Sequence, residues 1–166
     1  MPVSRGFGRE LGRIYGKQAN GVAGLIEQSA AQSGIPVSVF AGLLYQESGF
    51  NPKAVSSAGA KGIAQFMPGT AGSEQKFNPM DPSQAIPNSA RHLRGLYDAV
   101  AKYKPPTEND RLALMLAAYN AGLGNVDSAV RRAGGSAWNL VSRHLPQETR
   151  NYVPAIAKHA SRLGGQ

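Results

Sequence analysis

One acidic side chain of the sequence, Glu47, has surroundings that favour chemistry. Phe40, Leu43, Leu44 and Glu47 are spaced i, i+3, i+4, i+7, so a helix would place all four on one face. Burial of that apolar face and the negative end of the helix dipole both disfavour ionisation, so we expect a raised pKa for the Glu47 carboxyl. A carboxylic acid that stays protonated near neutral pH can protonate a glycosidic oxygen. The alternative is a structural glutamate that pairs with an arginine across the core.

The other residues able to do chemistry have more ordinary settings. Most of the remaining acids lie among polar or basic neighbours, and Asp81 precedes a proline as a helix cap would. The histidines have no metal-ligand spacing, so we expect them at the surface or lightly packed, and we expect no metal and no other cofactor: His92, His144 and His159. The chain has no cysteine, which excludes a disulfide framework or a thiolate site.

Four short motifs surround and follow Glu47. They are residues 47–56 (ESGFNPKAVS), residues 59–71 (GAKGIAQFMPGTA), residues 118–122 (AYNAG) and residues 148–153 (ETRNYV). In this order and at these separations they closely resemble the soluble-type lytic transglycosylases, the family 1 group related in fold to goose-type lysozyme. The resemblance covers about residues 35 to 156 and leaves residues 1–20 outside.

The resemblance implies a role for each matching position. Glu47 matches the catalytic acid/base, and Ser56 matches a residue that contacts the acetamido group of the sugar. The remaining positions match residues that line the substrate groove or orient the substrate: Gln65, Met67, Tyr119, Asn120, Glu148 and Tyr152. Tyr119 is further expected to donate to the Glu47 carboxyl or to hold its rotamer. Phe66 is expected in the core rather than in the groove.

The sequence departs from the family pattern at two positions. Ala64 stands where the family often has Met, and Ala85 stands where Asn often follows the Asp-Pro turn. The first difference is expected to reshape a subsite. Neither removes a chemical group that the reaction needs.

The resemblance also implies how one carboxylate suffices. An ordinary glycosidase uses two carboxylates around the scissile bond, and no second acid lies near Glu47 in its motif. A lytic transglycosylase cleaves the MurNAc-β-1,4-GlcNAc bond of peptidoglycan without water. Its glutamate first acts as an acid on the leaving oxygen, and the substrate's acetamido group stabilises the developing cation. The same glutamate then acts as a base on the C6 hydroxyl, which closes a 1,6-anhydro ring.

The elements that would position these residues are mainly helices. Apolar spacing predicts a helix over 20–33 that stops at Gly34, and a second over 36–48 with Pro36 in its first turn. Residues 49–67 have loop signals, with a short strand or an extended wall over 62–67, and Pro68–Gly72 is expected to be a short helix. Five more helical stretches are expected further along: Asp81 to the break at Lys104-Pro105-Pro106, Thr107 to Gly122, about 125–133, about 136–143, and from Pro146 onward.

The predicted fold is therefore mainly α and lysozyme-like, of the goose-type lysozyme/SLT class, with a small β or extended segment near residues 55–67. The predicted catalytic domain is 20–166. Residues 1–19 are predicted to be a basic N-terminal arm, because Arg5, Arg9, Arg13 and Lys17 recur every four residues. Glycines between them weaken a helix, so we expect a loose arm, for which a helical form when docked stays open.

The formal net charge of +8 favours anionic partners, among them nucleic acid, anionic lipid and the acid-rich bacterial wall. Outside residues 5–17 the basic residues are scattered, so specific nucleic-acid binding is not expected. No run approaches the ~20 apolar residues of a membrane span, and none resembles the core of a signal peptide. We expect a monomer that acts on glycan strands in the periplasm or cell wall. It would be a phage virion or secretion component, or an enzyme without its leader.

Three other functions are consistent with parts of this pattern. A muramidase would hydrolyse the same bond with the same acid. A non-catalytic wall-binding module of a virion or secretion assembly would keep the fold without the reaction, although Glu47 and Tyr119 argue against it. A nucleic-acid-binding helical protein would account for the charge alone.

Overall fold

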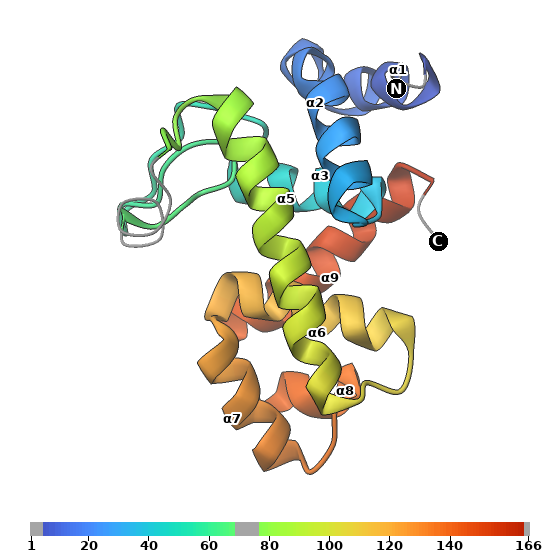
Figure 1. The fold of residues 1–166 in the computed structure, drawn as a ribbon, viewed down its shortest axis with the longest axis vertical. Helices are drawn as coiled ribbons and strands as arrows, with labels where there is room; N and C mark the ends of the chain where they lie inside the picture. Colours follow the sequence, from blue (N-terminus) through green and yellow to red (C-terminus); the bar gives the residue numbers. More distant parts are fainter. Residues whose placement is uncertain (1–4, 69–76, 165–166) are drawn as a thin grey trace. The chain divides into compact units, whose positions relative to one another are not determined.

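The computed structural model describes residues 5–68 and 77–164, and it is mainly helical, as predicted (Figure 1). The chain forms two compact units: the first contains residues 1–91 and 158–166, and the second contains residues 92–157. The described helices are, in chain order, α1 (Arg5–Tyr15), α2 (Lys17–Ser33), α3 (Val37–Ser48), α5 (Pro82–Ala99), η1 (Val100–Tyr103), α6 (Glu108–Ala121), α7 (Leu123–Ala133), α8 (Trp138–Val141), η2 (Ser142–His144) and α9 (Gln147–Arg162).

Helices α2 and α3 confirm the predicted start of the fold. α2 ends at Gly34, which has a left-handed φ of 66° and donates its N–H to carbonyls of the last turn. Pro36 is the N-cap of α3 and thus lies one position before the first helical residue, where its missing N–H costs nothing. Phe40, Leu43 and Leu44 are fully buried, so the apolar face inferred from their spacing is a core face.

The N-terminal segment is where the structure differs most from the prediction. α1 is a helix that packs against α2 within the first unit (Figure 1), not a loose arm. Leu11 is fully buried, and its burial offsets part of the cost of the helical glycines. A Cβ on Gly12 would come within 3.0 Å of the Asn20 Cβ, so this glycine permits the close approach of the two helices. The predicted boundary between an N-terminal arm (residues 1–19) and the catalytic domain (residues 20–166) stays a prediction.

The β structure predicted near residues 55–67 is reduced to two isolated antiparallel bridges. These bridges pair Val55 with Lys61 and Lys61 with Phe66. Between them the backbone follows successive turns, so this region, which we call the wall, is a turn-rich loop rather than a strand. The short helix predicted over Pro68–Gly72 lies, apart from Pro68, outside the described residues.

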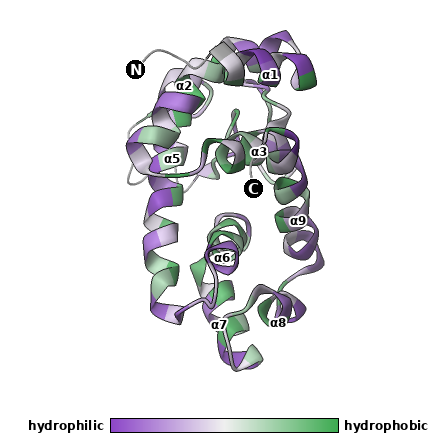
Figure 2. Cartoon of the chain, turned by 90° about the vertical axis from the view of Figure 1, so that its right-hand side faces the viewer, coloured by the Kyte–Doolittle hydropathy of each residue, from purple (hydrophilic) through white to green (hydrophobic). Residues whose placement is uncertain are grey.

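Helix α5 begins where the Asp81-Pro82 signal predicted. The Asp81 carboxylate accepts a hydrogen bond from the Ser83 backbone N–H at 3.0 Å, and hydrogen bonds from its neighbours hold the pKa of this carboxyl below its usual range. Hydrophilic and hydrophobic residues alternate along α5 in Figure 2, which is typical of an amphipathic helix. Among the helices that the structure describes, none is both long and apolar enough to cross a membrane.

The second unit is built on α6, whose ends were predicted from single residues. The Thr107 hydroxyl accepts a hydrogen bond from the Asp110 backbone N–H at 3.1 Å, which caps the helix N-terminus. At the other end the chain leaves the helix at Gly122. Leu114 and Met115 are fully buried, so α6 supplies the core of this unit.

Candidate active site

Glu47 is half-buried in the last turn of α3. Gly49 ends the helix with a φ of 62° and donates its N–H to the Tyr45 carbonyl oxygen at 2.8 Å. The Ser48 hydroxyl donates to the Ile63 carbonyl oxygen at 2.7 Å and so ties this end of α3 to the loop that follows. The carboxyl therefore lies on a helix end that is fixed by a buried face on one side and by a loop contact on the other.

The wall formed by residues 54–66 is held by backbone hydrogen bonds between its turns. The Lys61 and Phe66 backbones exchange hydrogen bonds of 2.9 and 3.0 Å, and the Gly62 N–H donates to the Ala54 carbonyl at 2.8 Å. Gly62 has a φ of 83°, and a Cβ there would lie 1.8 Å from the Pro79 carbonyl oxygen. Only glycine fits this position, because the backbone of the next segment occupies the space of a side chain.

Three predicted substrate-binding residues lie on or next to this wall. The Ser56 hydroxyl oxygen accepts a hydrogen bond from the Ala60 backbone N–H at 3.0 Å, which leaves the hydroxyl hydrogen for an outside acceptor. The Gln65 amide donates to the Ala54 and Gly62 carbonyls at 3.2 and 2.9 Å, so its nitrogen organises the loop. Met67 is 45% exposed, whereas Phe66 is buried against Phe77, as predicted for a core residue.

The two departures from the family pattern are both fully buried alanines, Ala64 and Ala85. Ala64 is enclosed by protein and presents no side chain to solvent, so any effect on a subsite would be indirect. The reshaped subsite expected from it stays a prediction.

In the second unit, Asn120 and Glu148 come together although 28 residues separate them. The Asn120 amide donates to the Glu148 carboxylate at 3.3 Å, and its carbonyl oxygen accepts from the Thr149 hydroxyl at 2.7 Å. Thr149 is 1% exposed and Glu148 is exposed, so a buried hydroxyl orients Asn120 toward a carboxylate at the surface.

Tyr119 and Tyr152 complete the predicted set in this unit. The Tyr119 ring packs against the His92 ring, with centroids 5.4 Å apart and an interplanar angle of 52°. Burial lowers the pKa of His92, which favours the neutral ring at neutral pH. Tyr152 is only 5% exposed, so it lies in the core of the unit rather than on an open surface.

Several residues that build these arrangements were missed by sequence reasoning. Ser48, Gly62 and Thr149 stand inside the recognised motifs, but their hydrogen-bond partners and close neighbours are not visible in the spacing. The three histidines were expected at the surface or lightly packed: His144 is exposed, and His92 and His159 are half-buried in contact with aromatic rings. One signal for His92 was available, because Leu96, four residues later on α5 and buried, lies on the same side of the helix.

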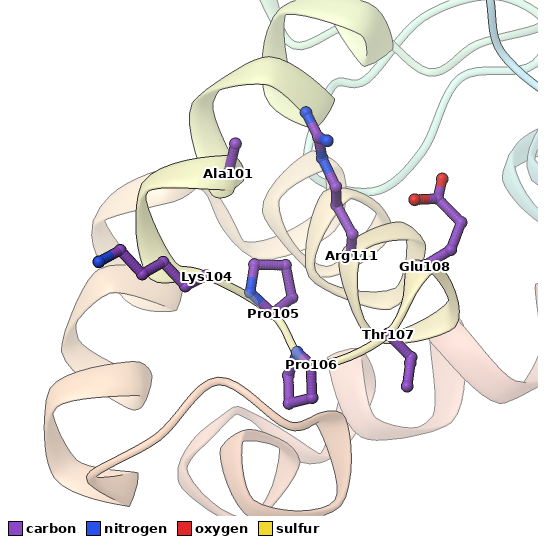
Figure 3. Close-up of a pocket in the computed structure, with 7 residues that line it drawn as sticks. All are labelled: Ala101, Lys104, Pro105, Pro106, Thr107, Glu108 and Arg111. Carbon is purple, nitrogen blue, oxygen red and sulfur yellow. The ribbon is translucent and has the colours of Figure 1, made fainter.

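A separate depression in the second unit contains none of the predicted site residues (Figure 3). Several of its polar groups are already engaged: Glu108 accepts a hydrogen bond from the Tyr97 hydroxyl at 2.8 Å, and the Arg111 guanidinium lies 3.6 Å from the centre of the Tyr97 ring. The Thr107 hydroxyl caps α6. We therefore do not assign chemistry to it. The described residues also include no cluster of three or more His, Cys, Asp or Glu side chains suited to a metal.

Comparison with known proteins supplies the family. The profile of the family described as "Transglycosylase SLT domain" matches residues 24–141. A membrane-bound lytic murein transglycosylase F from Alcanivorax borkumensis is 32% identical over 147 residues, which cover 86% of this chain and 31% of that protein. The chain thus spans about a third of the length of this curated relative.

Two solved structures have the same fold. The 70 kDa soluble lytic transglycosylase SLT70 from Escherichia coli matches with a TM-score of 0.71 and 26% identity, covering 92% of this chain and 26% of that one. An inactive mutant of the lytic transglycosylase Slt from Pseudomonas aeruginosa matches with a TM-score of 0.68 and 27% identity, covering 84% of this chain and 23% of that one. These matches confirm the predicted fold class. Together with the profile match over most of the chain, they show that this chain belongs to the family of transglycosylase SLT domains.

Proposed function

We propose that this chain is a lytic transglycosylase that cleaves the MurNAc-β-1,4-GlcNAc bond of peptidoglycan, with Glu47 as its catalytic acid/base. One observation carries the proposal. Glu47 lies at the end of a helix whose apolar face, formed by Phe40, Leu43 and Leu44, is fully buried, and Ser48 fastens that helix end to the wall of residues 54–66. A carboxyl held in this way can meet the same substrate atoms at each turnover, as a group that acts twice in one reaction must.

In the proposed reaction, the Glu47 carboxyl donates its proton to the glycosidic oxygen, and the bond between that oxygen and the MurNAc C1 breaks. The 2-acetamido group of the same sugar stabilises the cationic C1. The Glu47 carboxylate then takes the proton of the C6 hydroxyl, and the C6 oxygen bonds to C1. The protons balance, because Glu47 is protonated both before and after the reaction, and no water is consumed.

The other predicted residues are proposed to bind and orient the glycan. Ser56 has a hydroxyl hydrogen to offer the acetamido carbonyl, and Met67 has exposed apolar surface for a sugar face. Gln65 would act through its carbonyl oxygen, since its nitrogen is engaged in the loop. In the second unit the proposed substrate-binding residues are Tyr119, Asn120, Glu148 and Tyr152, of which the buried Tyr152 would support the others from beneath.

The proposal extends to the biological setting of the chain. The substrate would be peptidoglycan glycan strands in the periplasm or cell wall, and the chain would act there as a monomer. The proposed carrier of such a domain is a virion or a secretion assembly. The alternative carrier is a longer enzyme, because the chain spans about a third of the relative from Alcanivorax borkumensis.

The proposal is tested by the chemical ends of the products. Purified peptidoglycan is digested with the protein, and the released fragments are identified by mass spectrometry. We expect 1,6-anhydroMurNAc ends, each lighter than a reducing end by one water. Reducing ends would make the protein a muramidase, and an absence of fragments would favour a non-catalytic wall-binding module. Glu47→Gln serves as the control for contaminating activity.

A further inference from the structure

A cluster of aromatic rings lies beside the segment that carries Glu47, and all its members belong to the first unit. Tyr15 is the last residue of α1, Tyr45 is on α3, Phe50 follows α3, and His159 is near the end of α9. Figure 1 shows the end of α9, in red, close to α3. The cluster thus joins three regions of sequence that are far apart.

Tyr15 contacts the chain on both sides of Glu47. Its ring centroid is 4.4 Å from that of Tyr45, two residues before Glu47, and 5.5 Å from that of Phe50, three residues after it. The Tyr45 and Phe50 rings also contact each other at 5.8 Å. One ring from α1 therefore spans the point at which the helix of Glu47 ends.

The backbone at the end of α3 is in a strained conformation that the ring contacts stabilise. Phe50 has a φ of 62°, a left-handed conformation that a residue with a side chain seldom adopts, and it directly follows the left-handed Gly49. Phe50 is 1% exposed, so its ring is fixed in the core while its backbone is strained. Without the ring contacts, the helix end would be able to relax and to carry Glu47 with it.

His159 contacts both Tyr15 and Tyr45. Its ring lies edge-on to Tyr45 with centroids 4.5 Å apart, and its Nδ1 is 3.3 Å from the Tyr15 hydroxyl. Burial, and then the nearby Arg162 and Lys158, lower the pKa of His159, which keeps the ring neutral and suited to aromatic packing.

We propose that Tyr15 and His159 are positioning residues for Glu47, which fix the backbone from Tyr45 to Phe50 and thereby the placement of the catalytic carboxyl. Both lie outside residues 24–141, the part that matches the family profile. The basic N-terminal helix α1 would then contribute to catalysis, because its last residue, Tyr15, helps to place Glu47. This inference rests on the assignment of Glu47 made above.

The test compares two truncations on the same helix. Tyr15→Ala removes the ring, whereas Leu11→Ala removes a fully buried side chain of α1 that is not in the ring cluster. Rates are measured on a soluble oligosaccharide of alternating GlcNAc and MurNAc, below the unfolding temperature of every variant. We expect Tyr15→Ala to lower kcat roughly ten- to a hundredfold with little change in KM, because a small misplacement of the acid affects the reacting state more than binding. Leu11→Ala should keep most of kcat.

Conservative variants separate packing from hydrogen bonding. Tyr15→Phe keeps the ring and should restore kcat, and His159→Ala should lower kcat in the same direction as Tyr15→Ala. If Tyr15→Ala fails to fold, Tyr15→Leu, which keeps apolar volume without a ring, is measured in its place. Equal kcat in the Tyr15 and Leu11 variants would overturn the inference. Activity retained by Glu47→Gln in the same assay would instead overturn the assignment of Glu47.

Discussion

Glu47→Gln is expected to lower the rate of peptidoglycan cleavage by roughly a thousandfold or more, because one group supplies both proton transfers and each is worth about 10²–10⁴-fold. The amide of glutamine keeps the size and some of the hydrogen bonding of the carboxyl but can neither donate nor accept the proton at the glycosidic bond. The rate of fragment release from purified peptidoglycan measures the effect, with circular dichroism and thermal unfolding to confirm that the fold is kept.

A second glutamate of the first unit provides the matched control. Glu10 lies on α1 with its side chain 40% exposed, where it pairs with Arg13, and it lies outside the recognised motifs. Glu10→Gln makes the same chemical change and should leave the rate near that of the wild type. If both variants retain activity, Glu47 is not the acid, and if both lose it, the loss does not report on catalysis.

Gly62→Ala is expected to destabilise the first unit strongly. The new Cβ would meet the Pro79 carbonyl oxygen at 1.8 Å and the Pro79 carbonyl carbon at 2.7 Å, both of them backbone atoms. The left-handed φ of 83° adds strain for any residue with a side chain. We expect the free energy of unfolding to fall by roughly 2–5 kcal/mol, and the activity to fall with it as the wall of residues 54–66 shifts.

Gly59→Ala separates the two causes, because Gly59 has a φ of 89° but, among the residues that the structure describes, only the Pro68 Cγ within 4 Å of the added Cβ, at 3.9 Å. It should lose only about 1–2 kcal/mol, the cost of a left-handed residue with a side chain. Denaturant unfolding of the two variants beside the wild type gives both values. Equal losses would mean that the contact with Pro79 does not constrain the wall.

The helices that carry the predicted site were accessible from the sequence, because their signals are local. The spacing of Phe40, Leu43 and Leu44 gives the buried face of α3, and Thr107 and Gly122 mark the two ends of α6. Each of these signals acts within one or two helical turns of the residue that carries it.

The remaining features depend on contacts between distant residues. By helix propensity the glycines of α1 indicate a weak helix. The absence of a side chain at Gly12, however, lets Asn20 of α2 approach closely, and this contact is not visible in the sequence. The wall of residues 54–66 has strand-like residue types, yet its hydrogen bonds run between its own turns. The Thr149–Asn120 hydrogen bond joins residues 29 apart, and no spacing within a helix implies it.

The claim that Glu47 closes an anhydro ring without water is tested most directly by digestion in water enriched in heavy oxygen. Peptidoglycan is cleaved by the wild-type protein in this water, and the newly formed MurNAc ends are examined by mass spectrometry. The proposed reaction predicts 1,6-anhydro ends with no heavy oxygen, because the new bond to C1 comes from the sugar's own C6 hydroxyl. Reducing ends that carry one heavy oxygen would contradict it and would establish hydrolysis at the same bond.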